Sequence, residues 1–300
     1  MAEVRLQVSE LCKAYGDFIA VDDVSFEVFA GEVFGLLGPN GAGKTTTIRI
    51  VMDIFSPDHG SVLVLGHPPG KMRERVGYLP EERGLYRDLK VLDTLVYLGE
   101  LKGMRRSDAR ASGQRWLERL ELAEWSDHKV KDLSRGMQQK LQIAAALVHD
   151  PDLVVLDEPF QGLDPLNVQL VKEIIRELQQ AGKAVLLSAH QMNLVEVLCD
   201  RILLINWGRA VLYGPLQEIK ARYGARQVRV RARTVPEDLP GVAHMERHDH
   251  TWTLTLEQIS PEDLLRELLH RHVSIEAFEI ASMPLEEIFL NAVRGEQHVA

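Results

Sequence analysis

The form G-x-x-x-x-G-K-T runs through residues 38–46, which read Gly38-Pro39-Asn40-Gly41-Ala42-Gly43-Lys44-Thr45-Thr46. An apolar, strand-like segment, Val33–Leu37, comes directly before it, and a helix-like segment, Thr46–Met52, overlaps its end. A strand, a glycine-rich loop and a helix in this order are the context in which the motif binds phosphate groups. We therefore read residues 38–46 as a phosphate loop rather than as a glycine-rich turn that happens to contain a lysine.

The residue types of this loop suit an anion. Glycines at positions 38, 41 and 43 allow backbone conformations that residues with a Cβ avoid, so successive N–H groups can point at one phosphate. The helix that follows directs the positive end of its dipole at the same point. Lys44 adds a charge for the β and γ phosphates, and the Thr45 hydroxyl is placed to ligate Mg²⁺.

The composition limits the class of protein. The 300 residues suggest about two domains, and 45% apolar residues allow a substantial core. The net charge of −9 does not favour a general attraction to nucleic acid or anionic lipid, so we expect no nucleic-acid partner. Cys12 and Cys199 are far apart and lack metal-ligand spacing, which fits free thiols in a reducing cytosol.

No segment predicts secretion or a membrane span. The N-terminal residues lead into an alternating, strand-like stretch instead of an apolar signal segment. The longest unbroken apolar run is Ile143–Val148, whereas a spanning helix needs about 20 residues. If the chain works at a membrane, we expect a separate chain to supply the spans.

Strands alternate with helices over much of the chain. Near-continuous apolar runs predict buried parallel strands at Val33–Leu37, Leu153–Leu156, Ala184–Leu187 and Ile202–Ile205. Alternating patterns predict further strands near the N-terminus, at Val4–Leu11 and Val24–Val28. Apolar residues in Val168–Ala181 keep a helical spacing. This order predicts an α/β domain with a largely parallel sheet.

Two regions depart from the alternation. Residues from about 88 to 148 carry only helical patterns, which predict an inserted helical subdomain with helices at Leu92–Leu101, Ser107–Leu120 and Arg135–His149. After Tyr223-Gly224-Ala225 the pattern becomes that of a small α+β domain, with strands at Gln227–Arg233, Thr251–Glu257 and Val273–Ile280 and helices at Pro261–His270 and Pro284–Val293. We predict domains over residues 1–222 and 223–300.

A phosphate loop alone fits kinases, GTPases, helicases and transport ATPases, so further residues must distinguish them. Asp157 and Glu158 end the predicted strand Leu153–Leu156, where ligands of open α/β sheets bind. Asp157 suits Mg²⁺, directly or through water, and Glu158 suits a general base that polarises the attacking water. The alternative is a simple strand-end turn before Pro159.

A third segment, Leu133–Lys140, precedes this carboxylate pair. Ser134 can cap the helix that follows, and Gly136 allows close backbone approach. An anion could then bind to the Ser134 hydroxyl, the backbone amides and the positive end of the helix dipole. The alternative is that this segment is an ordinary helix start.

Over about residues 4–220 the chain resembles the ATP-binding subunits of ABC transporters. Leu133-Ser134-Arg135-Gly136-Met137 is similar to the family's L-S-G-G-Q signature, and Gly162-Leu163-Asp164 to its D-loop. His190 follows a strand, as the switch histidine does, and Tyr15 stands in the place of the aromatic residue that stacks on adenine. The resemblance implies a P-loop ATPase that binds ATP and Mg²⁺.

The resemblance also implies partners. Two ATP-binding domains are expected to face each other head to tail, with each ATP between residues 38–46 of one chain and residues 134–137 of the other. One chain carries one set of motifs, so a homodimer or a closely related partner is implied. A polytopic permease would be a separate chain, with this subunit peripheral on the cytoplasmic face of the cell membrane and the surface around Tyr86–Val91 helping to meet it.

Two positions differ from the family pattern. Glu81 stands where the family usually has Gln, and a carboxylate there can ligate Mg²⁺ or orient water while adding negative charge beside the phosphates. Arg135 and Met137 replace Gly and Gln of the signature, and Arg135 can meet phosphate or solvent.

Shorter resemblances favour an exporter. Gly77–Tyr86 and Pro284–Leu290 resemble segments of prokaryotic sodium-extruding and drug-exporting subunits. The alternatives are an ABC-type mechanical ATPase in translation or DNA repair, without a permease, and a regulatory module that binds nucleotide but hydrolyses it slowly. Translation-type members usually carry two ATPase units and repair-type members a long coiled coil, and neither is present in the sequence.

The last domain offers weaker constellations. His244, His248 and His250 invite a metal hypothesis, but their charged segment reads as a solvated loop. Three arginines share one strand face by the period-two rule and are expected to face solvent or a dimer rim: Arg229, Arg231 and Arg233. Leucines at helical spacing are expected to pack the core of this domain: Leu264, Leu265, Leu268 and Leu269.

Overall fold

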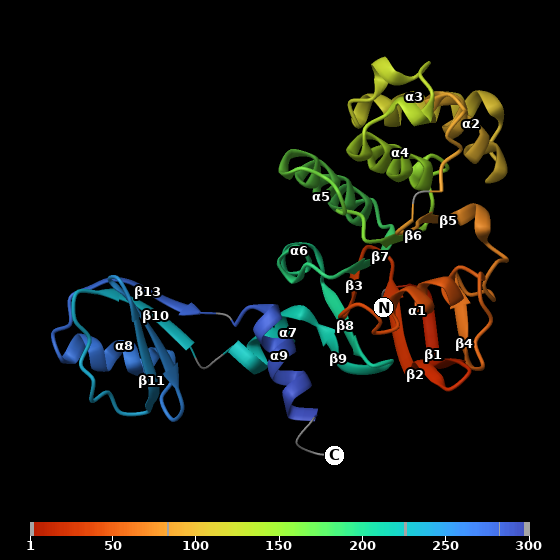
Figure 1. Ribbon diagram of the computed structural model, residues 1–300. Helices are drawn as coiled ribbons and strands as arrows, with labels where there is room; N and C mark the ends of the chain where they lie inside the picture. The colour runs from red at the N-terminus through yellow and green to blue at the C-terminus, as the bar shows by residue number, and fades with distance from the viewer. Residues whose placement is uncertain (1–2, 83, 225–226, 282, 297–300) are drawn as a thin grey trace. The chain divides into compact units, whose positions relative to one another are not determined.

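The computed structural model describes residues 3–82, 84–224, 227–281 and 283–296. The chain forms two compact units, which divide between Gly214 and Pro215 (Figure 1). The division lies before the predicted boundary at residue 222, because the helix α7 (Leu216–Gly224) contacts α9 (Leu285–Glu296) of the second unit. Sequence patterns place the change of character after Tyr223, at the C-terminal end of this helix.

The central sheet of the first unit has six strands in the order β5-β6-β7-β3-β8-β9. Their bounds are β5 Val76–Leu79, β6 Leu153–Asp157, β7 Ala184–Ala189, β3 Val33–Leu37, β8 Arg201–Asn206 and β9 Arg209–Pro215. The first five are parallel. β3, β6 and β7 are buried along their whole length, which explains their near-continuous apolar sequences.

A second sheet of three antiparallel strands lies in the same unit. β1 (Val4–Tyr15) pairs with β2 (Phe18–Phe29) on one side and with β4 (His59–Val64) on the other. Residues Gly16 and Asp17 form the turn between β1 and β2. The helix α1 (Lys44–Val51) contacts β2 and β4 as well as β6, so it lies between the two sheets. One continuous core, which includes Phe26, Phe34 and Ile48, fixes the start of α1 and with it the phosphate loop.

The helical subdomain is confirmed. Its helices are α2 (Val91–Leu101), α3 (Arg106–Arg119) and α4 (Arg135–Leu147), each within two residues of the predicted bounds. They pack against one another and lie together beside the β5 end of the sheet (Figure 1). Besides α1 to α4, the described part of this unit has two more helices longer than one turn, α5 (Pro165–Gln180) and α6 (Met192–Leu198).

The second unit is the expected α+β domain. Its antiparallel sheet has the order β11-β12-β10-β13, with β10 Gln227–Ala232, β11 Val242–His248, β12 Thr251–Leu256 and β13 Ile275–Ala281. Arg229, Arg231 and Arg233 are exposed, as predicted. From α8 (Pro261–His270), Leu264 and Leu268 enter the core, but Leu269 is 57% exposed, so the prediction that all four leucines are core is wrong for Leu269.

The histidine-rich segment of this unit is not a loop, contrary to the prediction. His244 and His248 lie on β11. Of the three histidines, only His250 lies in the turn before β12. His244 Nε2 lies 3.1 Å from Glu246 Oε1. No group of three or more metal-ligating side chains gathers anywhere in the described part of the chain, which argues against the metal hypothesis. Within the same residues, no helix is both long and apolar enough to cross a membrane.

Candidate functional site

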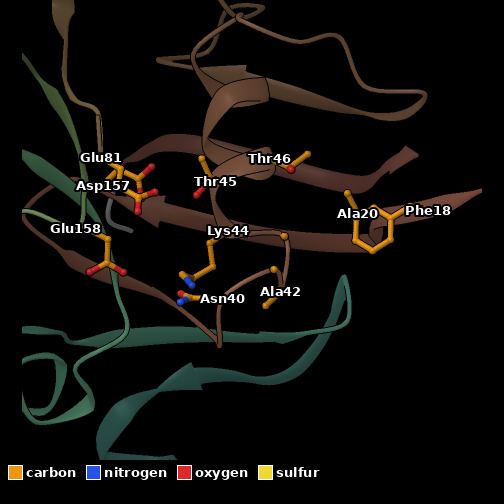
Figure 2. A pocket seen from close by; sticks show the side chains of 12 residues that line it. Phe18, Ala20, Asn40, Ala42, Lys44, Thr45, Thr46, Glu81, Asp157 and Glu158 are labelled. Carbon is orange, nitrogen blue, oxygen red and sulfur yellow. The ribbon is translucent and has the colours of Figure 1, made fainter. Parts of the chain in front are cut away.

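A cavity of about 320 Å³ opens at the carboxyl end of the central sheet. It is formed by the loop between β3 and α1, the end of β6, the start of β2 and the segment after β5 (Figure 2). The lining residues are Phe18, Ala20, Asn40, Gly41, Ala42, Gly43, Lys44, Thr45, Thr46, Glu81, Asp157 and Glu158. The structure thus brings most of the predicted phosphate loop together with all three predicted carboxylates.

Close backbone packing explains two of the loop glycines. Gly38 has a φ of 149°, and a Cβ there would lie 2.2 Å from the carbonyl oxygen of Ile205. Gly43 has a φ of 109°, and its Cβ would lie 2.3 Å from the carbonyl oxygen of Ala20. Neither position tolerates a side chain, because the backbones of β8 and β2 pack directly against the loop. This packing fixes the conformation of the loop.

Lys44 is the cation of the cavity. Its side chain is buried, and Nζ donates hydrogen bonds to the carbonyl oxygens of Gly38 at 2.7 Å and Pro39 at 3.1 Å. Burial lowers the pKa of Lys44, while the carboxylates of Glu158, Asp157 and Glu81 act in the opposite direction. The ammonium group is therefore held by the loop itself and faces three acidic side chains.

Asp157 offers an unshared oxygen. Its side chain is 1% exposed, and the Ser188 hydroxyl of β7 donates to Oδ1. Oδ2 is buried and has no hydrogen-bond partner among the described residues. Burial raises the pKa of Asp157, and Glu81 and Glu158 add to this effect. A buried carboxylate oxygen without a donor, in one cavity with Thr45 and Glu81, fits a divalent cation with oxygen ligands.

Glu158 is positioned by β7. Its backbone has a φ of 52°, and its N–H group donates to the carbonyl oxygen of Ser188 at 3.2 Å and to the Ser188 hydroxyl at 3.3 Å. Its Oε2 lies 2.8 Å from Nδ1 of His190. The Glu158 side chain is 12% exposed and that of His190 is 51% exposed. A carboxylate so placed can accept a proton from water near Lys44.

The other predicted ligands lie outside the cavity. Ser134 caps α4 and accepts a hydrogen bond from the N–H of Met137 at 3.3 Å. Arg135 is exposed, and Gly136 lies near the D-loop, where its Cβ would be 3.8 Å from the carbonyl oxygen of Gly162. Asp164 caps α5 by accepting from the N–H of Asn167 at 2.9 Å. Within one chain these residues do not reach the phosphate loop's cavity.

The apolar end of the cavity contains a residue that sequence reasoning missed. Phe18 lines it, whereas Tyr15 does not. The Tyr15 ring contacts the edge of Phe55 at 6.2 Å between centroids, and Lys13 Nζ lies 5.7 Å from the Tyr15 ring centre. Ser188, which hydrogen-bonds to both Asp157 and Glu158, was also missed; its only sequence signal is its place at the end of a buried strand two residues before His190.

Family comparisons match both units. Residues 21–161 match the ABC transporter family, and residues 214–293 match the family described as ATP-binding protein DrrA1-3-like, C-terminal domain. The second match begins where the two compact units divide.

Individual proteins are similar over long stretches. The uncharacterised ABC transporter ATP-binding protein YhaQ of Bacillus subtilis is 39% identical over 96% of this chain and 98% of its own length. Nod factor export ATP-binding protein I of Paraburkholderia xenovorans is 41% identical over 71% of this chain and 72% of its own length. A solved structure described as the ATP-binding subunit of an ABC transporter superposes with a TM-score of 0.69 at 28% identity, covering 88% of this chain and 99% of that one.

Proposed function

The chain belongs to the ATP-binding subunits of ABC transporters, and we propose that its ATP hydrolysis drives a separate membrane permease in the direction of export. As a member of this family it is an ATPase. One observation carries the assignment of the reaction to this cavity: Glu158, hydrogen-bonded to His190, lies in the same cavity as the buried Lys44. A carboxylate base and a phosphate-binding cation are what hydrolysis of a terminal phosphate requires.

Residues in and around the cavity have proposed roles. Residues 38–46 bind the phosphates, with Lys44 at the β and γ groups. Thr45, Asp157 and Glu81 would hold Mg²⁺, which supplies charge neutralisation at the phosphates when bound. Glu158 accepts the proton of the attacking water, and His190 orients Glu158 and meets the γ phosphate. Tyr15, paired with Phe18 across the β1–β2 turn, contacts the adenine.

A second copy of the chain would complete the site. Ser134, Arg135, Gly136, Met137 and Asp164 lie away from the cavity of their own chain. Ser134 and Arg135 are exposed at the N-terminus of α4, where backbone N–H groups and the helix dipole favour an anion. A head-to-tail homodimer would bring this helix end to the ATP held by the partner's phosphate loop.

A groove between the helical subdomain and the residues around β5 is the proposed docking site for the permease. The groove has a volume of about 300 Å³ and is mostly apolar, with contributions from α2 and α4 that include Leu98, Leu101 and Ala145. Leu101 is 63% exposed, and the nearby Tyr86 is 53% exposed and packs edge-on against Tyr97. We place the permease contact here, which would locate the subunit at the cytoplasmic face of the membrane.

Export is supported by one named relative, whose description states that it is an export ATP-binding protein. Reconstitution tests the whole proposal. The purified chain is combined in lipid vesicles with the membrane protein encoded beside it, and MgATP hydrolysis is measured with and without that protein. We expect hydrolysis that increases several-fold with the membrane protein. Equal hydrolysis in both samples would contradict the permease assignment, and no hydrolysis in either would contradict the assignment of this cavity.

A further inference from the structure

The turn between β8 and β9 carries a tryptophan that the fold does not explain. Trp207 and Gly208 connect the two strands, and their φ angles are 49° and 79°. Two-residue hairpin turns with two positive φ angles favour Asn-Gly or Asp-Gly, because a bulky side chain is strained there. Packing does not offset the strain, since Trp207 is 77% exposed. A large apolar residue that is both strained and exposed indicates a role outside the fold.

Hydrogen bonds hold this turn against the nucleotide cavity. The N–H of Gly208 donates to the carbonyl oxygen of Ala42 in the phosphate loop at 3.0 Å. The carbonyl oxygen of Gly208 accepts from the N–H of Asp22 on β2 at 2.8 Å. Arg209, the next residue, pairs with Asp22 at 2.7 Å between Nη2 and Oδ2. The position of Trp207 is therefore fixed relative to both the loop and β2.

The cavity has two chemically different ends, which set the direction of a bound nucleotide. Glu81, Asp157 and Glu158 lie at one end, Phe18 and Ala20 lie at the other, and Lys44 lies between them (Figure 2). With its terminal phosphate between Lys44 and Glu158, a nucleotide extends its nucleoside toward Phe18 and Ala20. Gly208 borders this same end, because its Cβ would lie 3.1 Å from the carbonyl oxygen of Ala20.

We propose that Trp207 is a nucleoside-binding residue, which contacts the nucleoside of ATP from the β8–β9 turn. The inference rests on the proposed function of residues 38–46. On the β1–β2 turn, Tyr15 and Phe18 face each other in the strand register and are 45% and 53% exposed. The nucleoside then lies between aromatic residues of two hairpins, where stacking is favourable because a base has two apolar faces.

The test compares ATP with inorganic tripolyphosphate, which lacks the nucleoside. Binding of each ligand with Mg²⁺ to the purified full chain is measured by calorimetry for the wild type, Trp207→Asn and Trp207→Phe. Asn suits the turn, so Trp207→Asn is expected to fold at least as stably as the wild type. We expect Trp207→Asn to bind MgATP about tenfold more weakly, at the lower end of base–aromatic stacking, and to bind tripolyphosphate as the wild type does. Trp207→Phe is expected to retain most of the affinity.

Two results would overturn the inference. Equal affinity of the wild type and Trp207→Asn for MgATP would remove Trp207 from the nucleoside site. An equal loss for ATP and tripolyphosphate would mean that the turn acts through the phosphate loop. A wild type that binds neither ligand would instead contradict the proposed function itself, which keeps the two failures distinct.

Discussion

The Nδ1 atom of His190 lies 2.8 Å from Oε2 of Glu158, and the two residues come from the ends of neighbouring strands. Ser188 binds the backbone of Glu158 and the side chain of Asp157, so one short segment at the end of β7 organises both acidic residues. These contacts orient the base of the proposed reaction. This arrangement leads to the first prediction.

Replacing His190 should impair the reaction more than binding. In His190→Ala, Glu158 loses the side chain that holds its carboxylate, and we expect kcat to fall about 100-fold, the low end of the range for acid–base catalysis. The Kd for MgATP should change by less than about tenfold, because the phosphate loop and Lys44 are untouched and only the contact of His190 with the γ phosphate is lost. Steady-state hydrolysis and equilibrium binding measure the two quantities. Unchanged kcat would show that His190 does not position the base.

Asp157 should oppose stability while serving the reaction. Burial raises its pKa, so the folded chain retains this proton to higher pH than the unfolded chain does. The free energy of unfolding therefore falls as the pH rises from the ordinary carboxyl range through the raised pKa of Asp157. Above that pKa the loss is complete. We expect Asp157→Asn to raise the Tm of the nucleotide-free chain at pH 7 and to lower Mg²⁺-dependent hydrolysis at least about 100-fold. A lower Tm would contradict the assigned cost of this charge.

A buried histidine should make the stability depend on pH. Burial lowers the pKa of His149 to about 4, and its Nε2 lies 3.1 Å from the carbonyl oxygen of Val76. The unfolded chain takes up this proton near pH 6.5, so stability falls as the pH decreases from about 6.5 to about 4. Thermal melts of His149→Gln should depend less on pH in this window than those of the wild type. His67→Gln, at an exposed site of the same unit, is the matched control and should melt like the wild type.

Arg201 should be a major source of stability in the first unit. Its guanidinium lies 4.9 Å from the Phe29 ring centre and 5.1 Å from that of Tyr213, and its Nη1 lies 3.2 Å from Oε1 of Glu32. The Glu32 side chain is 8% exposed, and burial raises its pKa. We expect Arg201→Met to lower the free energy of unfolding by about 3 kcal/mol, because Glu32 is left buried without a cation.

A double-mutant cycle separates this pair from the ring contacts. In the Glu32→Gln background, Arg201→Met should cost clearly less, since no buried charge remains unpaired. Urea unfolding followed by circular dichroism gives the four free energies. Equal costs in both backgrounds would assign the stabilisation to the aromatic contacts alone.

Local patterns were sufficient to predict the bounds of some elements in both units. β3 has the bounds predicted from its apolar run, and α8 begins and ends where its helical spacing indicated. Both predictions depend on neighbours in sequence. By contrast, β4 and β9 carry too few buried residues to give a strand pattern, and their pairing is decided by strands distant in the chain.

The site was predicted as a set of residues rather than as a geometry. The phosphate loop and the carboxylates Glu81, Asp157 and Glu158 do share one cavity. The contact of Ser188 with both Asp157 and Glu158 depends on the side-by-side pairing of β6 and β7, which no local spacing encodes. The strained turn at Trp207 was also invisible, because backbone conformation there follows from the junction of β8 with β9.

The central claim is that each ATP is held between two copies of this chain, and Glu158→Gln tests it most directly. The substitution removes the base but keeps the shape of the side chain, so MgATP should bind without being hydrolysed. Light scattering of the purified variant with saturating MgATP should give twice the mass of one chain, with two ATP molecules bound per pair, and Ser134→Arg in addition should return it to a single chain. A Glu158→Gln variant that binds MgATP and remains a single chain would contradict the claim.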